Sequence, residues 1–368
     1  MKAVFRLFYY ISILLTCVLA GVTFIGCLAG YISPYECMFA SFVALFLPTL
    51  LLLNMGAVLY WAIRWRFWVF LPLLAVVANW GFLTRVIQLS NTASDLYVQT
   101  DSTASANYTQ LVVATYNVDR FGSDHVARSC KEIASYMKTQ EVDVMCFQEF
   151  GGNNDFTVDS IRTTLSEWTY SYIPIGSPDK DPLLQLAIFS RYPIRAQQLV
   201  TYPDSKNCSL WCDIDINGQV VRLFNNHLQT TAVSHNRREL EREFKIESGQ
   251  GICRALSTLI SGLRDNFKKR SVQANYLRHM VDVSPHPTLV CGDLNSLPSS
   301  YTYRQIIGTK LLDGFQTCGK GYMHTYRYLK RLLRIDYIFH TADFIGLEYF
   351  SPELEHSDHK PVLMRMKI

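Results

Sequence analysis

The sequence carries little net charge, and its first quarter is nearly free of acidic residues. Across 368 residues, 35 Lys and Arg face 31 Asp and Glu, which leaves a net charge of +4. So slight a charge, with 49% hydrophobic and 13% aromatic residues, excludes a disordered chain and a strongly polycationic one. Glu36 is the single acid among residues 1–90, whereas residues 91–368 are neutral overall.

Internal repeats are missing, and so are cysteines with zinc spacing and matching partners. Cys208 and Cys212 are close enough in sequence to suggest a disulfide in an oxidising compartment. Cys146 and Cys291 lie inside apolar runs and are interpreted as core residues. The cysteines therefore point to no metal centre, and the function has to be sought among other residues.

Three long apolar stretches do stand out, at 8–31, 37–63 and 67–89. Each is near or above the roughly 20 residues that cross a bilayer as a helix. We expect three transmembrane helices within residues 1–90. A cleaved signal peptide is the alternative for the first stretch, although its apolar run is longer than usual and two more follow it.

The basic residues around these stretches predict an orientation. Lys2 and Arg6 precede the first stretch, and Arg64 and Arg66 lie between the second and the third. The loop at 33–36 has no Lys or Arg. By the positive-inside rule the N-terminus is cytoplasmic, so the chain after the third stretch faces outward. We expect a multi-pass membrane protein with an extracytoplasmic domain.

A polar linker, residues 91–109, precedes a mixed α/β domain at 110–368. Several of its strands are apolar on nearly every residue, so both faces of each strand should be covered. Two sheets packed face to face with helices outside would satisfy this pattern. The strands are expected at 111–116, 143–148, 184–190, 208–216, 219–226, 287–292, 333–340 and 361–366. The helices are expected at about 124–139, 157–167, 235–265 and 271–283.

Apolar strand runs repeatedly end in a side chain able to bind metal or phosphate. Asn117, Glu149, His227 and Asp293 each follow such a run, and Asn295 lies two residues further on. Each alone has an ordinary structural explanation, such as a turn residue or a solvated strand end. Together they are typical of a functional site built at strand ends.

Three acids are suited to a hard divalent cation such as Mg²⁺, namely Glu149, Asp293 and Asp358. Asp336 lies inside the apolar strand run RIDYIF. Its unpaired burial would be costly, and a histidine is an economical partner for it. We expect His359 to be that partner.

Seven motifs occur in the order ATYNVDRFG, VMCFQEF, LAIFSRYPI, FNNHL, GDLNSLPSS, RIDYIF and SDHKPV. This set closely resembles the endonuclease/exonuclease/phosphatase superfamily of metal-dependent phosphoesterases, over residues 110–368. The resemblance implies a four-layer α/β/β/α sandwich. Two departures are that no second acid matches as a partner of His227, and that the active-site tyrosine of some DNA-repair members is not matched.

The resemblance also implies a role for each motif residue in metal-assisted hydrolysis. Mg²⁺, with Mn²⁺ as a substitute, would be bound directly by Glu149, with Asn117 beside it and Asp358 completing the metal region. Asp293 would orient or deprotonate the attacking water, and Asn295 would help to hold the phosphate. The pentacovalent phosphorus and the leaving group would be served by His227 and His359, the latter supported by Asp336.

Two segments have no assigned part in this chemistry. Residues 232–280 are long and strongly helical, and they either form an outer helical layer, cap the active site or lie against the membrane. Residues 320–334 contain five basic residues and no acid. That segment is either a solvated hairpin or a grip for phosphate groups, and Lys320, Arg327 and Arg334 are its candidate substrate-binding residues.

Three functions remain compatible with the sequence. The first is a membrane-tethered, nuclease-type phosphodiesterase acting on extracytoplasmic DNA or RNA, and the wording of GDLNSLPSS favours it slightly. The second is a lipid phosphoesterase that cleaves a sphingomyelin-like or phosphoinositide-like headgroup, which the anchor would keep nearby. The third is a non-catalytic membrane-bound binding domain. The sequence identifies no protein partner.

Overall fold

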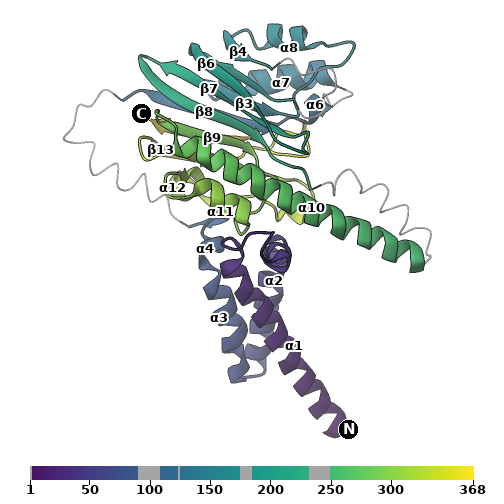
Figure 1. Cartoon of the computed structure of the whole chain (residues 1–368). Helices are drawn as coiled ribbons and strands as arrows, with labels where there is room; N and C mark the ends of the chain where they lie inside the picture. Colours follow the sequence, from purple (N-terminus) through teal and green to yellow (C-terminus); the bar gives the residue numbers. More distant parts are fainter. Residues whose placement is uncertain (1, 90–107, 123–124, 175–184, 232–248) are drawn as a thin grey trace, which may run out of the picture.

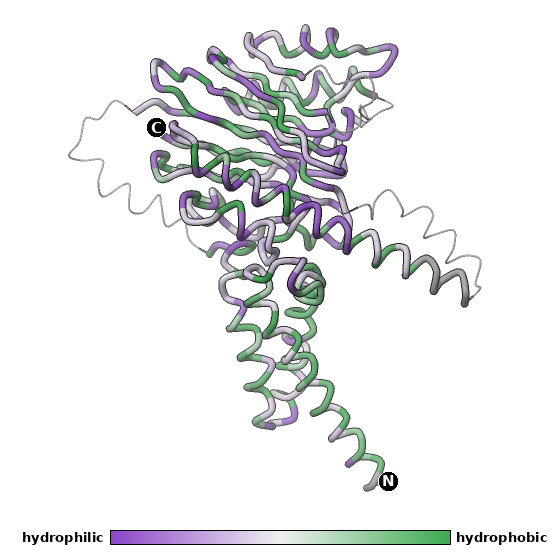
Figure 2. The backbone as a smooth tube through the Cα atoms, in the orientation of Figure 1, coloured by the Kyte–Doolittle hydropathy of each residue, from purple (hydrophilic) through white to green (hydrophobic). Residues whose placement is uncertain are grey.

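The computed structural model describes residues 2–89, 108–122, 125–174, 185–231 and 249–368. Almost all of the expected linker, 91–109, lies outside these residues. The chain forms an apolar helical stem at its N-terminus and an α/β domain at the end of that stem (Figure 1). The stem is apolar along its length (Figure 2).

Two helices among the described residues are long and apolar enough to cross a membrane by length and composition. They belong to α1 (Lys2–Ala29) and α2 (Met38–Ile63). Only 22% of the apolar window of α1 and 33% of that of α2 is buried within the chain. The core helix of a soluble domain would be mostly buried, which α1 and α2 are not.

The prediction of a third membrane-length helix is wrong. The stretch 67–89 folds as a short 3₁₀ turn, then α3 (Phe70–Ala78) and α4 (Trp80–Leu83). The interruption is at Asn79, whose side-chain amide donates to the carbonyl oxygens of Thr23 and Ala75, each at 2.9 Å. α3 nevertheless packs against both α1 and α2.

Two mixed six-stranded sheets form the domain, and each contains one parallel pair. The strand order in the sheet that contains β9 is β10, β12, β9, β8, β7, β6, and in the sheet that contains β2 it is β13, β14, β2, β3, β5, β4. The bounds in the β9 sheet are Leu312–Asp313, Asp336–His340, Thr288–Asp293, Gln219–His227, Cys208–Ile216 and Ile194–Thr201. The bounds in the β2 sheet are Ile345–Phe350, Val362–Lys367, Gln110–Asn117, Val144–Gln148, Ala187–Ser190 and Tyr170–Tyr172. A two-stranded ribbon pairs β1 (Ile87–Gln88) with β11 (Gly321–Tyr322).

Three apolar clusters hold these elements together. One draws side chains from both sheets, for example Val113 and Leu223. The second packs the β2 sheet against α7 (Val126–Thr139) and α8 (Val158–Thr164). The third packs the β9 sheet against α10 (Gly249–Asp282) and α11 (Tyr301–Ile307). These clusters explain why the strands are apolar on both faces, as the sequence predicted.

The expected helices at 235–265 and 271–283 are one continuous helix, α10, within the described residues. Its C-terminal half supplies Ala274, Leu277 and Val281 to the third cluster, and its N-terminal half projects beyond the domain (Figure 1). The disulfide that the sequence suggested between Cys208 and Cys212 does not fit β7, on which both residues lie. They are four positions apart on β7, which places them about 13 Å apart, too far to bridge.

Polar contacts join the stem to the domain. Arg85, directly after α4, donates to the carbonyl oxygen of Pro298 at 3.2 Å and lies over the ring of Tyr303. Its own carbonyl oxygen accepts from Arg334 at 2.7 Å. The stem therefore meets the domain beside the loop that follows β9.

Candidate active site

The two parallel strand pairs end at the same place, and the motif residues lie there. In the β2 sheet, Asn117 pairs with Gln148, and Glu149 follows directly. In the β9 sheet, His227 pairs with Asp293 across the parallel ladder. The neighbouring antiparallel strand brings Asp336 opposite Asp293. Carboxyl ends of parallel strands point the same way, so each sheet presents its polar residues at one edge.

The backbone turns sharply as it leaves these strands. Glu149 has φ 50° and Asn295 has φ 48°, both in the left-handed region that is uncommon outside glycine. Gly292 has φ 131°, and no other residue fits at this position, because a Cβ there would collide with the carbonyl oxygen of Asn226. Strained turns of this kind cluster at functional sites, where surrounding structure holds them in place.

A buried polar network fixes the two sheets next to the site. Gln148 donates to the side-chain oxygen of Asn225 at 2.6 Å. Asn225 in turn donates to the carbonyl oxygens of Phe147 and Ala187, each at 3.0 Å. Gln148 precedes Glu149, and Asn225 lies two residues before His227, so this network sets the distance between the two strand ends.

Asn117 links the two acids of the site. Its amide nitrogen lies 3.0 Å from Oε1 of Glu149 and 3.2 Å from Oδ2 of Asp293. Its oxygen accepts from the backbone N–H of Asp119 at 3.2 Å, which fixes the direction of the amide. Asn295 donates to Oδ2 of Asp293 through its side chain, at 3.2 Å, and to Oδ1 through its backbone, at 2.8 Å. Asp293 is therefore held in one orientation from two sides.

The expected pairing of Asp336 with His359 is present. Nδ1 of His359 lies 2.9 Å from Oδ2 and 3.2 Å from Oδ1 of Asp336. Nε2 then faces the site, 3.7 Å from Asp293 and 3.9 Å from Asp358. Burial alone would lower the pKa of His359, but Asp336 and Asp293 outweigh it and raise that pKa well above 6.5. The ring is therefore a cation at neutral pH.

His227 differs from His359 in its hydrogen bonding and in its charge. It is fully buried, and neither ring nitrogen has a hydrogen-bond partner among the described residues. The nearest acids are Glu149, 3.6 Å from Nε2, and Asp293, at 3.8 Å. Burial lowers the pKa of His227 to about 4, so the ring is neutral. The sequence offered no acid as a partner of His227, and among the described residues no carboxylate forms a hydrogen bond with its ring.

Negative charge accumulates in the site. Burial and then the nearby acids raise the pKa of Glu149 to about 7, although Asn117 and His359 lower it. Burial, with Asp358 and Glu149, also raises the pKa of Asp119 to about 6. The pKa of Asp293 is raised by burial and by Asp336. These carboxylates are held together at an electrostatic cost that a divalent cation would remove.

The donor set fits a hard cation. Glu149 keeps 25% of its side chain exposed and Asp358 keeps 28%, so both can be reached from outside. One further group, Asp293, Asp336 and His359, has ligand atoms within 4.8 Å of one another. Asp336 and His359 are hydrogen-bonded to each other, however, which leaves the oxygen-rich set around Glu149 as the better match for Mg²⁺.

The structure brings together the eight motif residues that the sequence singled out: Asn117, Glu149, His227, Asp293, Asn295, Asp336, Asp358 and His359. Three neighbours were missed. Asp119 stands in the motif ATYNVDRFG and might have been found from its place after a strand end. Tyr326 packs edge-on against His359, with ring centroids 5.2 Å apart. The third, Arg270, comes from α10 and had no sequence pattern to reveal it.

Two of the three candidate substrate-binding residues are engaged elsewhere. Arg334 is fully buried and paired with Asp313 at 2.6 Å, so its assignment to substrate is wrong. Arg327 binds Glu353 at 2.6 Å and the carbonyl oxygen of Ser357 at 2.9 Å, which ties down the loop before Asp358. Lys320 is exposed next to β11, the strand that pairs with the end of the stem.

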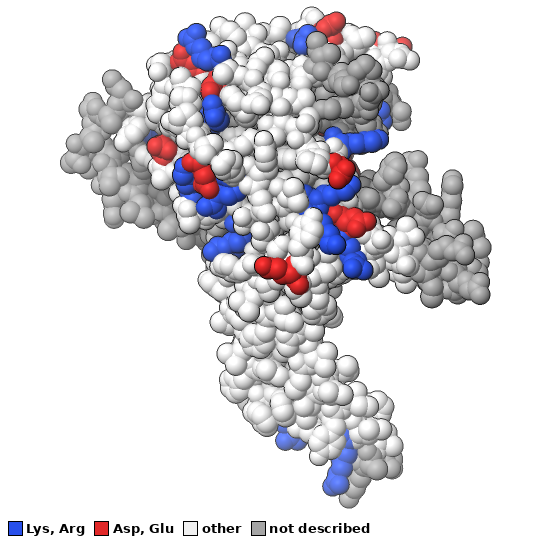
Figure 3. Space-filling model, in the orientation of Figure 1, with Lys and Arg blue, Asp and Glu red and all other residues white. Residues whose placement is uncertain are grey.

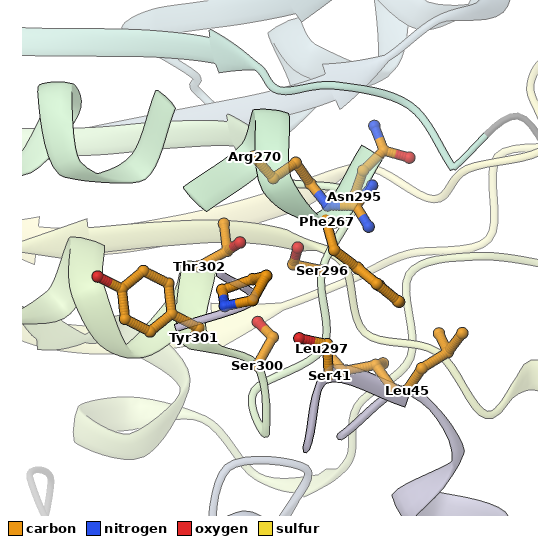
Figure 4. A pocket seen from close by; sticks show the side chains of 11 residues that line it. Ser41, Leu45, Phe267, Arg270, Asn295, Ser296, Leu297, Ser300, Tyr301 and Thr302 are labelled. Carbon is orange, nitrogen blue, oxygen red and sulfur yellow. The ribbon is translucent and has the colours of Figure 1, made fainter. Parts of the chain in front are cut away.

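A narrow hollow lies between the site and the top of the stem (Figure 4). Arg270 reaches it from α10, with Nη1 donating to the carbonyl oxygen of Gln229 at 2.7 Å and Nε lacking a partner among the described residues. Asn295 lines the same hollow, together with Ser41 and Leu45 from α2. The hollow therefore connects a residue of the site with the helices of the stem.

Comparisons with known proteins agree with this geometry. A model of the endonuclease/exonuclease/phosphatase family matches residues 114–359, well over half of the chain. A second model, described as a domain of unknown function (DUF8431), matches residues 6–86. No curated protein matches the chain.

Solved structures share the fold of the domain. A humanized D. rerio TDP2 matches with a TM-score of 0.51 at 16% identity, covering 70% of this chain and 98% of that one. An endonuclease/exonuclease/phosphatase from Bacteroides vulgatus matches with a TM-score of 0.50 at 17% identity, with the same two coverages. TDP2 from C. elegans matches with a TM-score of 0.50 at 13% identity, over 81% of this chain and 85% of that one. The chain belongs to the endonuclease/exonuclease/phosphatase family, whose members are metal-dependent phosphoester hydrolases.

Proposed function

We propose that this protein is a membrane-anchored, Mg²⁺-dependent phosphoester hydrolase that works by in-line attack of water. The observation that carries the proposal is the convergence of Glu149, Asp293 and His359 at the ends of two parallel strand pairs. An acid open to solvent, a buried acid and a charged imidazole are the groups that hydrolysis of a phosphoester needs. A purely binding domain would not need two buried acids held close to each other.

We assign the metal to Glu149, with Asn117 beside it and Asp358, 3.9 Å from Nε2 of His359, completing the metal region. Mn²⁺ is the expected substitute. When bound, the cation would offset the charge of the phosphate and polarise its oxygens. The raised pKa of Glu149 supports this assignment, because a carboxyl that resists ionisation in the metal-free site gains most from a cation.

The protein's own residues divide the remaining work. Asp293 is fixed by two hydrogen bonds from Asn295, so it can orient the attacking water and take its proton. His359, charged and held by Asp336, stabilises the negative charge that develops on the phosphoryl oxygens. His227 is neutral, and since neither ring nitrogen has a hydrogen-bond partner among the described residues, its N–H can donate to a phosphoryl oxygen. This assignment of His227 needs no acidic partner.

We propose that residues 1–90 are the anchor and 110–368 the catalytic domain. The exposed apolar surfaces of α1 and α2 support a membrane location. α3 and α4 pack beside them and would bring the chain back to the side of the domain. The distribution of basic residues favours an extracytoplasmic catalytic domain. The three apolar clusters likewise support an α/β/β/α layering of the domain. A cleaved signal sequence remains the alternative for α1.

The contacts of the basic residues support a different order of the candidate substrates. The case for a nucleic-acid grip at residues 320–334 is weaker, because Arg334 and Arg327 are paired within the protein and only Lys320, Lys330 and Arg331 are exposed. The hollow beside Asn295 instead has walls from α2, at the end of a helix proposed to lie in the bilayer. We therefore propose a phosphoester of a membrane lipid as the substrate, with a nuclease-type activity as the second candidate. The lipid headgroup and the membrane are then the partners expected for this protein.

The test is a substrate panel with the purified full chain in nanodiscs, assayed in Mg²⁺ and in EDTA. The panel contains phospholipids and sphingomyelin within the disc, and plasmid DNA, RNA and a chromogenic phosphodiester outside it. We expect hydrolysis of a lipid in Mg²⁺ only, and its loss in Glu149→Gln. Cleavage of nucleic acid with all lipids intact would reverse the order of substrates. Full activity in EDTA or in Glu149→Gln would overturn the hydrolase mechanism itself.

A further inference from the structure

The projecting half of α10 has an apolar face that the domain does not cover. Leu256, Ile260, Leu263 and Phe267 follow one another at spacings of four, three and four residues, so they lie on one side of the helix. Leu256 is 42% and Ile260 47% exposed, whereas Leu263 is 5% exposed. Exposed apolar residues in a helical stripe mark a surface that another apolar phase covers.

The covered end of this stripe rests on the stem. Phe267 meets Phe42 edge-on, with ring centroids 5.5 Å apart, and Lys268 lies over the ring of Tyr35 at 5.5 Å. Phe42 is four residues inside α2, which corresponds to about 6 Å along the helix axis. α10 therefore crosses the stem at the level where α2 would enter a bilayer, and it runs across the stem's long axis (Figure 1).

The side chains around this level are those of a membrane interface. Arg304 lies 4.5 Å from the ring centre of Tyr31, in the manner of Lys268 and Tyr35. Lys and Arg, with some Asp and Glu among them, lie where the stem meets the domain, whereas the body of the stem shows almost no charged residues (Figure 3). Aromatic rings with basic groups beside them are typical of the headgroup region, where anionic lipids attract the basic groups.

The polar face of the projecting half fits the same place. Ser257 and Ser261 lie on the side away from the stripe, and Arg264 and Asp265 follow at the end of this half. A helix with an apolar stripe on one side and polar residues on the other is suited to lie in the plane of the interface rather than across it. The apolar stripe continues directly from the contact with α2, so its exposed part points to the same phase that surrounds α2.

We propose that the projecting half of α10 is an interfacial membrane helix, which inserts Leu256 and Ile260 among the lipids beside the stem. This rests on the proposed membrane location of α1 and α2. The helix would hold the domain at a fixed height and tilt, with the hollow and Asn295 turned toward the lipid headgroups. The occupant of the apolar face is thus the bilayer, not a second copy of the chain or another protein.

The experiment is site-specific photo-crosslinking of the full chain in native-like vesicles that contain anionic phospholipid. Single variants Leu256→benzoylphenylalanine and Ile260→benzoylphenylalanine probe the stripe. Ser261→benzoylphenylalanine and Asp265→benzoylphenylalanine are the matched controls, on the polar face of the same turns. After illumination, mass spectrometry identifies what each probe has captured. We expect lipid adducts from both stripe positions and their loss at both control positions.

A further probe at Leu53, in the middle of α2 and 55% exposed, separates this inference from the proposed anchoring. Lipid adducts at Leu53→benzoylphenylalanine without adducts at Leu256 and Ile260 would leave the anchor intact and overturn the inference. Adducts of the stripe to protein, or equal lipid adducts on both faces of α10, would overturn it as well. A failure at Leu53 too would show that the proposed membrane location is wrong.

Discussion

Two buried clusters of charge lie close together in the chain and behave in opposite ways. Asp313 and Arg334, both fully buried, form a neutral pair beside the stem. Each oxygen of Asp313 accepts two hydrogen bonds, from Arg334 and from Tyr303 or the backbone of Phe315. Two residues further on, Asp336 belongs to the site, where acids outnumber cations.

The difference teaches what marks a functional site in this protein. Burial and ionic pairing are present in both clusters, so neither one identifies function. Asp313 and Arg334 balance each other, and the pKa of Arg334 is raised well above its usual range, burial lowering it but Asp313 outweighing that. In the site, by contrast, burial and then the neighbouring acids raise the pKa values of Glu149 and Asp293, and the nearby His359 does not outweigh them. An uncompensated excess, rather than burial, distinguishes the site.

The largest effect is expected from Asp293→Asn, which should separate activity from stability. Loss of the group that takes the water's proton should lower kcat by about 10²- to 10⁴-fold. In EDTA the melting temperature should stay the same or rise, because a buried carboxylate that repels Asp336 is removed. Steady-state kinetics and thermal unfolding of the same preparation check both. A fall of several degrees would mean that this acid is structural, like Asp313.

Asp313→Asn should give the reverse result. It leaves the charge of Arg334 buried without a counter-ion, which costs about 3–5 kcal/mol of unfolding free energy. The kcat of the folded fraction should change little, because Asp313 touches no residue of the site. Chemical unfolding checks the loss. The double variant Asp313→Leu with Arg334→Met is the control, and it should recover part of the stability, since the unpaired charge is gone.

A smaller effect is expected from Arg270→Gln, which tests whether the hollow belongs to the site. A guanidinium that binds a phosphate oxygen contributes about 1.5–3 kcal/mol, so KM should rise by about ten- to a hundredfold with a lesser change in kcat. Lys269→Gln, one position away on α10, is the matched control and should leave KM unchanged. If the two variants have equal KM values, Arg270 does not bind the substrate, and its role is limited to the hydrogen bond with Gln229.

Much of the site could be predicted from the sequence because its residues follow apolar strands. Glu149 and Asp293 end such runs, and strands of a parallel pair must present their ends at one edge. Asp336 was expected to need a histidine, since an unpaired acid in an apolar strand is costly. These inferences used only local pattern and the cost of burial, and both are visible in a sequence.

What could not be predicted depends on pairing across the fold. The sequence shows five basic residues in 320–334 but does not tell that Arg334 meets Asp313, 21 positions earlier. Arg270 comes to the site because α10 packs on the β9 sheet, which no local pattern indicates. The third apolar stretch is long enough for a span, but the helix is interrupted at Asn79, whose side chain donates to the carbonyl oxygen of Thr23 on α1.

The smallest effect is expected at Glu353, where a strong pairing lies near solvent. Burial raises its pKa, but hydrogen bonds from Lys360 and Arg327 outweigh this and lower it to about 2. A lowered folded pKa stabilises the protein fully above the unfolded value of 4.5, and this stabilisation is lost as the pH falls toward 2. Because half of the side chain is exposed, solvent screening limits the gain to about 1 kcal/mol or less. Unfolding of wild type and Glu353→Gln should therefore differ by that amount at pH 7, and the difference should shrink below pH 4.5 and vanish toward pH 2. A difference at pH 7 as large as that of Asp313→Asn would show that exposure does not separate the two kinds of pair.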